Sequence, residues 1–231
     1  MYIIKYKKII DGIFLERLNR FIAKVKVNGI IETVHVKNTG RCKELLVPNV
    51  KVYLYVSDNP NRKTKYDLIA VEKETDRGII LVNMDSQVPN DVVAEWLLKS
   101  KLFSLNAVIK REVKFGNSRF DFYVEDGERK AFVEVKGVTL ENDGVVSFPD
   151  APTERGVKHI NELVACLEQG FEAYIIFVVQ MKGVVNFEPN AEHHKEFADT
   201  LNSAREKGVK VLVYDCLVTP DSIEIDKRIE Y

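Results

Sequence analysis

Short alternations of apolar and polar residues fill the first third of the chain and predict β-strands. Side chains alternate faces along a strand, so a two-residue period indicates a strand with one buried face. Turn signals such as the Thr-Asp-Arg-Gly segment at residues 75–78 separate neighbouring runs. Five short strands with tight turns predict a small barrel or sandwich, and the five-stranded OB-type barrel is the natural candidate. The predicted strands are residues 14–27, 30–37, 50–56, 66–73 and 78–83.

The pattern changes near residue 83, after which helical spacing alternates with longer apolar strands. Residues 90–102 place apolar side chains such as Val92 and Trp96 at helical spacing. The run 173–180 is continuously apolar, which is typical of a strand buried on both faces. The order α-β-β-β-α-β-α-β predicts a mixed sheet flanked by helices. The remaining predicted strands are 106–115, 118–124, 130–137 and 209–218, and the remaining helices are 152–169 and 192–208.

These two patterns divide the chain into two predicted domains, and Pro89 supports a boundary between them. Residues 1–83 are expected to form an OB-type domain, and such barrels often bind nucleic acid. Residues 84–231 are expected to form an α/β domain with a mixed sheet flanked by helices. The predicted fold class is therefore α+β or mixed.

Charge is distributed unevenly between these parts, although the whole chain has a net charge of only −1. Residues 1–82 hold 16 Lys and Arg against 9 Asp and Glu, a balance of +7, whereas residues 83–231 hold 18 against 26, a balance of −8. A basic first part suggests a polyanion as its partner. A solvated basic face without a partner is the alternative, and charge alone does not decide between the two.

The composition argues against membrane, secreted and thiolate-zinc proteins. No run approaches the roughly 20 apolar residues that a membrane helix requires, and the N-terminal residues lack the apolar region and cleavage site of a secretory signal. The three cysteines, Cys42, Cys166 and Cys216, are odd in number and share no CxxC spacing. We therefore expect a cytoplasmic protein with reduced cysteines and no membrane partner, with a homodimer left open.

One predicted hairpin, residues 118–137, places three charged side chains on a single face. A Glu-Asp-Gly turn signal joins its two alternating strands. A four-residue loop sets Asp121 opposite Glu134, whereas a two-residue loop sets Asp121 opposite Phe132. Both registers keep Asp121, Glu134 and Lys136 on the same face, because cross-strand partners share a face.

Two carboxylates and a lysine on one patch have a specific chemical use. Carboxylates are hard oxygen ligands for Mg²⁺ or Mn²⁺, so Asp121 and Glu134 are the candidate metal ligands. Such a metal polarises a phosphodiester and lowers the pKa of a bound water. Lys136 can position or deprotonate that water, or offset charge on the phosphate. The alternative is an exposed strand face with a common Glu–Lys pair of little energetic value, although the apolar flanks favour a site.

Two further residues are candidates for the same catalytic site. Glu95 lies on the helix that precedes the three strands and can supply another carboxylate, or can simply face solvent. Gln180 ends the buried strand, where a polar side chain is well placed for a site, although ending a strand also explains it.

Candidate DNA contacts come chiefly from the basic first part. Guanidinium groups suit bidentate contact with phosphate, and amides or hydroxyls can bind phosphate and base edges or cap turns. Each one alone is also explained as a solvated surface residue. On the predicted helix 152–169, Arg155 and His159 lie one turn apart and can contact DNA beside the metal site. The first-part candidates are Arg17, Asn19, Arg20, Asn38, Thr39, Arg41, Arg62, Lys63 and Thr64.

Seven stretches in chain order carry a resemblance that no single stretch would establish. They are FLERLNRF (14–21), NTGRCKELLVPN (38–49), RKTKYDL (62–68), SRFDF (118–122), FVEVKGVTL (132–140), FPDAPTERGVKHINEL (148–163) and FVVQ (177–180). Together they resemble the sugar fermentation stimulation protein A family over nearly the whole length. The resemblance implies an OB-type domain joined to a PD-(D/E)XK, restriction-endonuclease-like domain, and DNA binding. It also places Asp121, Glu134 and Lys136 at the metal and catalytic positions.

Two functions follow as expectations. The first is a DNA endonuclease that hydrolyses phosphodiester bonds with Mg²⁺ or Mn²⁺, which the acidic–lysine constellation favours. The second is a non-catalytic DNA-binding regulator of sugar catabolism genes that uses a nuclease-like scaffold, which the basic first domain and the family name favour. RNA remains open as the polymer, because OB-type barrels do not reliably separate RNA from DNA.

Overall fold

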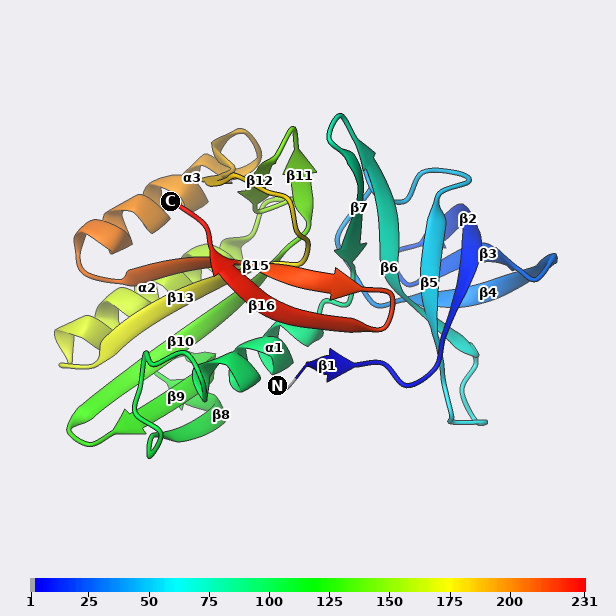
Figure 1. Cartoon of the computed structure of the whole chain (residues 1–231). Helices are drawn as coiled ribbons and strands as arrows, with labels where there is room; N and C mark the ends of the chain where they lie inside the picture. The colour runs from blue at the N-terminus through cyan, green and yellow to red at the C-terminus, as the bar shows by residue number, and fades with distance from the viewer. Residues whose placement is uncertain (1–2) are drawn as a thin grey trace.

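The alternating runs of the first part form a six-stranded sheet in a computed structural model that describes residues 3–231 (Figure 1). The strand order is β4-β3-β2-β5-β6-β7, and β4 also pairs with β6 in parallel. This pairing closes β2–β6 into the OB-type barrel that the alternation predicted, while β7 extends beyond the ring. Phe14, Val25 and Leu68 are buried in its interior. The strands are β2 (Ile9–Asn19), β3 (Ile22–Val27), β4 (Ile30–Val36), β5 (Lys51–Val56), β6 (Tyr66–Thr75) and β7 (Gly78–Asn83).

The predicted single strand 14–27 is wrong, because a tight turn divides it between β2 and β3. The Asn19 side-chain oxygen accepts hydrogen bonds from the backbone amides of Phe21 (2.9 Å) and Ile22 (3.1 Å). An asparagine that bonds to the backbone two residues ahead makes a turn without glycine or proline. The alternation therefore gave no visible sign of this turn.

The second domain is built on a mixed sheet, with seven strands among the described residues. Its order is β1-β16-β15-β13-β10-β9-β8, and the central strands β10, β13 and β15 are parallel. Residues 173–179 of β13 are all buried, as the continuous apolar run predicted. The strands are β1 (Ile4–Lys5), β8 (Val108–Phe115), β9 (Ser118–Asp126), β10 (Arg129–Val138), β13 (Glu172–Val179), β15 (Lys210–Thr219) and β16 (Ser222–Arg228).

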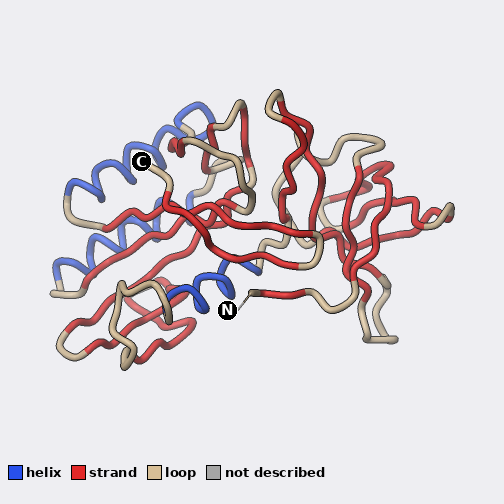
Figure 2. The backbone as a smooth tube through the Cα atoms, viewed as in Figure 1, coloured by secondary structure: helices blue, strands red, loops and turns tan. Residues whose placement is uncertain are grey.

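Helices cover both faces of this larger sheet and belong to the second domain alone (Figure 2). The helix α1 (Val88–Leu97) packs on one face, whereas α2 (Glu154–Glu168) and α3 (Ala191–Glu206) pack on the other. The Thr153 hydroxyl accepts the Gly156 amide at 3.1 Å and caps α2. None of the helices within residues 3–231 combines the length and apolar character needed to cross a membrane. Cys42, Cys166 and Cys216 are buried and free.

A small sheet that the sequence pattern did not predict lies beside the barrel and contacts it. It consists of β11 (Leu140–Asn142), β12 (Val145–Phe148) and β14 (Asn186–Pro189). Lys73 of β6 donates to the buried Glu141 carboxylate at 2.5 Å, and the same carboxylate accepts the Gly144 amide at 2.5 Å. This ion pair attaches the barrel to the second domain.

The connection between the domains is fixed by polar contacts at the carboxyl end of β13. The Gln180 side-chain amide donates to the carbonyl oxygens of Asn83 (3.1 Å) and Asp85 (3.0 Å). The Asp85 carboxylate is buried and accepts Lys37 Nζ at 2.5 Å. Residues 83–85 therefore bind side chains of both domains, Lys37 of the barrel and Gln180 of the second domain.

The beginning of the chain belongs to the larger sheet rather than to the barrel. Ile4 pairs with Ile223 and Lys5 with Ser222, so β1 lies antiparallel to β16 (Figure 1). The chain then leaves this sheet to build the barrel and returns at α1. The predicted first domain began at residue 1, whereas residues 4–5 lie in the sheet of the second domain.

Candidate metal centre

The hairpin β9–β10 has the register that sets Asp121 opposite Glu134. Lys130 pairs with Glu125, which is the register of the four-residue loop. The paired positions continue to Phe122 and stop one residue before Asp121. The two carboxylates therefore lie where the ladder ends and the strands begin to separate.

Beyond the end of the paired ladder, Asp121 bonds to β10 through its side chain rather than through its backbone. Its Oδ2 accepts the backbone amide of Val135 at 2.7 Å, and its Oδ1 accepts the side-chain amide of Asn90 on α1 at 2.7 Å. Burial, followed by the charge of Glu134, raises the pKa of Asp121 above its ordinary value. Asp121 is therefore held in a fixed orientation where its negative charge is poorly compensated.

Glu134 is buried, and only one of its two oxygens has hydrogen-bond partners. Its Oε1 accepts Lys136 Nζ at 2.6 Å and lies 2.5 Å from His159 Nδ1. Its Oε2 has no hydrogen-bond partner within residues 3–231. Burial pushes the pKa of Glu134 upward, but the contacts with His159 and Lys136 outweigh it, so the pKa is lowered. Glu134 is thus a charged carboxylate with one buried oxygen left unsatisfied.

The chemistry of this donor set fits a hard divalent cation. A buried acceptor without a partner costs roughly 1–3 kcal/mol, and a cation beside Glu134 Oε2 and Asp121 would remove that cost. No group of three or more His, Cys, Asp or Glu residues converges in the described part of the chain. The remaining ligands would therefore be waters, main-chain oxygens or substrate oxygens, a composition common for Mg²⁺.

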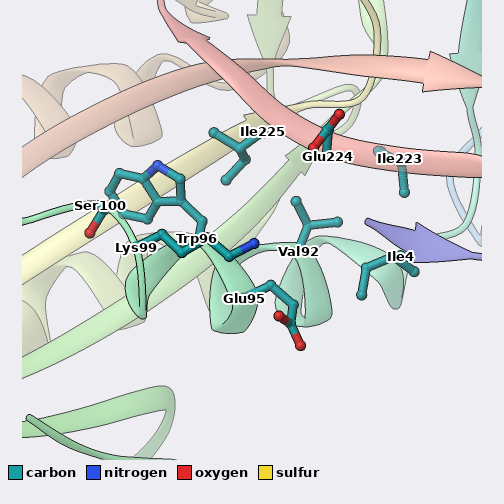
Figure 3. A pocket seen from close by; sticks show the side chains of 9 residues that line it. All are labelled: Ile4, Val92, Glu95, Trp96, Lys99, Ser100, Ile223, Glu224 and Ile225. Carbon is teal, nitrogen blue, oxygen red and sulfur yellow. The ribbon is translucent and has the colours of Figure 1, made fainter. Parts of the chain in front are cut away.

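The structure does not bring Glu95 to these carboxylates. Glu95 lies at the border of a groove between α1, β1 and β16, and its carboxylate points away from Glu224 on β16 (Figure 3). Asn90, from the same helix, contacts Asp121 instead. Five residues separate Asn90 from Glu95, which is about 140° around a helix, so the two side chains leave on different sides.

Gln180 and Arg155 border the carboxylates without touching them. Gln180 is buried and joins the domains through its amide group. Its Oε1 would lie 2.5 Å from a Cβ on Gly137, the residue after Lys136. Arg155 is exposed on α2, and its Nε lies 3.4 Å from His159 Nε2. Arg155 therefore remains available to DNA at the edge of the candidate centre.

His159 lies inside the candidate centre rather than on a DNA-facing surface. Its side chain is 6% exposed and contacts Glu134. A buried histidine cannot reach a DNA backbone, so the contact predicted for His159 is not available to it. The spacing from Arg155 placed both on one helix face but could not show which of them is covered.

Arg17 and Arg62 have partners within the barrel that occupy their guanidinium groups. Arg17 donates five hydrogen bonds of 2.6–3.2 Å to carbonyl oxygens. Arg62 contacts the buried Asp67 through both terminal nitrogens, at 2.7 and 2.5 Å. All five N–H groups of Arg17 are therefore used, and no donor is left for phosphate. Arg17 therefore holds the barrel together instead of contacting DNA, whereas Arg62, with a side chain that is 29% exposed, stays a predicted contact.

The other first-domain candidates remain on the surface or in turns. Asn19 and Asn38 accept backbone amides with their side-chain oxygens, Asn38 from Gly40 at 2.8 Å. Thr64 is half-buried. The exposed candidates are Arg20, Thr39, Arg41 and Lys63.

Family models match both domains of the chain. Residues 15–82 match the model described as SfsA N-terminal OB domain, and residues 87–222 match the model described as Sugar fermentation stimulation protein RE domain. The chain is 59% identical to the sugar fermentation stimulation protein homolog of Clostridium beijerinckii over 221 residues, 96% of each chain. It is 57% identical to the homolog of Ruminiclostridium cellulolyticum over 226 residues, 98% of each chain.

A solved structure has the same arrangement of elements. It is described as SfsA of Pyrococcus furiosus in complex with Ca²⁺, and its sequence is 28% identical. The superposition covers 99% of this chain and 98% of that chain, with a TM-score of 0.85. The two-domain fold is therefore shared by both chains over nearly their whole lengths.

Proposed function

The chain belongs to the sugar fermentation stimulation protein family, and from that premise we propose that it binds DNA and hydrolyses its phosphodiester bonds with a divalent cation. The observation that carries this proposal is the buried Glu134 Oε2, which lacks a hydrogen-bond partner within residues 3–231. A carboxylate kept only for structure is expected to have both oxygens satisfied, because an unsatisfied buried acceptor is costly. A cation held by Glu134 and Asp121 explains why this cost is tolerated.

The side chains around the carboxylates divide the remaining tasks. Asn90 and the Val135 amide fix the orientation of Asp121, and His159 fixes that of Glu134. A bound Mg²⁺ or Mn²⁺ would polarise the phosphodiester and lower the pKa of a coordinated water. Lys136 Nζ, 2.6 Å from Glu134 Oε1, carries a positive charge that can offset charge developing on the phosphate.

Cleavage assays on three variants test this proposal. The protein and its Asp121→Asn, Glu134→Gln and Lys136→Met variants are incubated with duplex and single-stranded DNA, and with RNA of the same sequence, in Mg²⁺ or Mn²⁺. We expect each substitution to lower the cleavage rate by at least about 100-fold, the usual effect of removing one electrostatic contact to the transition state. Glu125→Gln, at the other end of the same hairpin, is the matched control and should cleave normally.

Calorimetric titration with Mn²⁺ separates metal binding from turnover. Asp121→Asn and Glu134→Gln should lose the metal, because each removes a charged ligand. Lys136→Met should keep it, because an ammonium group has no lone pair for a cation. Equal cleavage by the unaltered protein and all its variants would identify a contaminating nuclease and contradict the proposal.

A non-catalytic DNA-binding regulator of sugar catabolism genes is the second candidate. It is favoured by the absence, in the described part of the chain, of a third His, Cys, Asp or Glu beside the two carboxylates. In this case Asp121→Asn and Glu134→Gln would leave DNA affinity intact, and none of the proteins would cut DNA. Loss of promoter-fragment binding in an Arg20→Ala, Arg41→Ala double variant would then assign the function to the barrel.

A further inference from the structure

A polar cleft of about 270 Å³ lies where the two domains meet. The barrel contributes the loop that contains Thr39 and Gly40, and the second domain contributes residues at the ends of its strands. In the described part of the chain, no lysine or arginine lines the cleft. Its main lining side chains are Thr39, Thr139, Ser147, Phe148, Asp150 and Gln180.

The cleft adjoins the candidate metal centre through a single glycine. Gly137 lines the cleft and directly follows Lys136 in β10. A Cβ at Gly137 would lie 2.5 Å from Gln180 Oε1 and 2.9 Å from Pro89 Cγ, so a larger residue does not fit there. A ligand in the cleft therefore lies against the residue that directly follows Lys136 in the same strand.

Two acceptor groups in the cleft have no hydrogen-bond partner within residues 3–231. Gln180 uses its Nε2 group for three hydrogen bonds to Asn83 and Asp85, while its Oε1 accepts none from residues 3–231. The Asp150 carboxylate likewise forms no hydrogen bond or ion pair with the described residues, and its Oδ2 faces Gly40. The cleft thus offers free acceptors without positive charge, which suits a ligand with N–H donors and does not suit a phosphate.

We infer that this cleft receives an unpaired nucleobase of the bound DNA, with preference for a base that carries an exocyclic amine. The inference rests on the proposed function, because the phosphodiester next to that nucleotide would lie at Asp121 and Glu134. The two N–H donors of an exocyclic amine match the acceptors Asp150 and Gln180 Oε1. The Phe148 ring supplies an aromatic contact of the kind on which unpaired bases stack. A paired base has its Watson–Crick edge occupied, so only a single-stranded or flipped nucleotide can enter.

The barrel side of the cleft is held rigidly, as base discrimination requires. Arg17 donates to the carbonyl oxygens of Gly40 at 2.8 Å, Arg41 at 2.7 Å and Asn38 at 2.6 Å. Arg17 of β2 therefore holds this loop through three of its carbonyl oxygens. Arg17 acts as a positioning residue in this arrangement and does not touch the base.

Fluorescence anisotropy with oligocytidylate, oligothymidylate and a duplex of equal length tests the inference. Cytosine carries an exocyclic amine and thymine does not, so the protein should bind oligocytidylate roughly fivefold or more tightly than oligothymidylate. Asp150→Asn should reduce this preference to less than about twofold. Gly40→Ala, which places a methyl group 2.5 Å from Asp150 Oδ2, should act in the same direction. Asp76→Asn, on the exposed β6–β7 turn, is the charge-matched control and should keep the preference.

The outcomes separate this inference from the proposal on which it rests. Equal binding of the two single strands by the unaltered protein, or a preference unchanged in Asp150→Asn, overturns the inference. Duplex binding without any affinity for single strands also overturns it and leaves DNA binding in place. If no DNA of any kind binds, the proposed function fails and the inference fails with it. Thermal melting of each variant confirms that it is folded.

Discussion

His159 is one of two side chains that contact Glu134 Oε1 and orient its carboxylate. It is buried, and its Nδ1 lies 2.5 Å from Glu134 Oε1. Residues that orient a metal ligand usually change metal affinity by 10–100-fold when removed. We predict that His159→Ala weakens Mn²⁺ binding by roughly that factor, measured by calorimetric titration.

Two comparisons decide whether this effect comes from orientation. His159→Asn keeps a side-chain donor and should recover part of the lost affinity. His193→Ala, on the exposed first turn of α3, should bind Mn²⁺ normally. Normal Mn²⁺ affinity in His159→Ala would show that Glu134 needs no partner on α2.

Arg17 stabilises the barrel, and its loss should be seen in folding before it is seen in DNA binding. Its five hydrogen bonds join residues 19–20 to residues 38–41. Since each net hydrogen bond contributes about 0.5–1.5 kcal/mol, Arg17→Ala should lower the free energy of unfolding by roughly 2–4 kcal/mol. Urea denaturation measures this change. Arg20→Ala, at an exposed position in the same region, should alter stability by less than about 0.5 kcal/mol.

Sequence patterns predicted the face of the strand on which a side chain lies, but not its contacts with residues far away in the sequence. Alternation placed Asp121, Glu134 and Lys136 on one face, because a strand fixes side-chain direction locally. The contacts of Arg17 with carbonyl oxygens more than 20 residues away depend on how the barrel closes. Asn90 was missed as the partner of Asp121 for the same reason, since 31 residues separate them. The family resemblance pointed to Asp121, Glu134 and Lys136 but not to Asn90.

At the scale of elements, an ion-pair network ties together the starting ends of β10, β13 and β15. Glu172 binds Arg129 Nε and Lys210 Nζ, both at 2.7 Å. The hydrogen bond from Arg129 is the main cause that lowers the pKa of Glu172 to about 2, with Lys210 adding to it. A carboxylate with a depressed pKa stabilises the fold above its unfolded pKa and loses that contribution as the pH falls through the folded pKa.

This network predicts a defined acid dependence. The contribution of Glu172 to the free energy of unfolding should be complete above pH 4.5 and should decline as the pH falls toward about 2. Glu172→Gln should therefore be less stable at neutral pH, by about 1 kcal/mol given the partial exposure of the ion pairs, and should match the parent near pH 2. Unfolding followed by circular dichroism across this range tests it, with Glu206→Gln as an exposed control. A constant difference at all pH values would contradict the assignment.

The longer elements could be predicted from the sequence, whereas the short ones could not. The continuous apolar run 173–180 and the capped helix after Thr153 each carry a signal of eight residues or more. The strands β11, β12 and β14 have three or four residues, which is too short for a period to be distinguished from chance. β11 and β12 line the cleft, and Glu141 of β11 binds Lys73 of the barrel, so two of the missed elements lie where the two domains join.

At the scale of the whole molecule, the exposed basic residues of the barrel should make the affinity for DNA depend on the salt concentration. The balance of +7 in residues 1–82 includes Arg20, Arg41 and Lys63, which are exposed. Each phosphate contact contributes about 0.9 to the slope of log affinity against log salt concentration. Replacing all three with alanine should therefore weaken binding and lower the magnitude of this slope by up to about 3.

A charge-matched triple variant distinguishes a local contact from a general charge effect. Lys195, Arg205 and Lys207 belong to α3 or its end, on the second domain, and their replacement removes the same charge. This control should change the slope little. If both triple variants lower the slope equally, DNA does not favour the barrel face.

The two-domain architecture followed from the sequence because each domain has its own hydrophobic period. The strand-rich barrel and the mixed sheet were both predicted from these periods. The path by which the chain connects them was not, since β1 has only two residues and pairs with a strand more than 200 positions away. A pairing of that separation leaves no trace in local periodicity.

The pairing of β1 with β16 also sets an order of events during synthesis. β1 is made first, yet it cannot join the larger sheet until β16 has emerged from the ribosome. The barrel between them has all of its own strands much earlier and can fold while translation continues. The pairing of β1 with β16 therefore follows the synthesis of all the barrel strands, and it closes the loop of chain that contains the barrel.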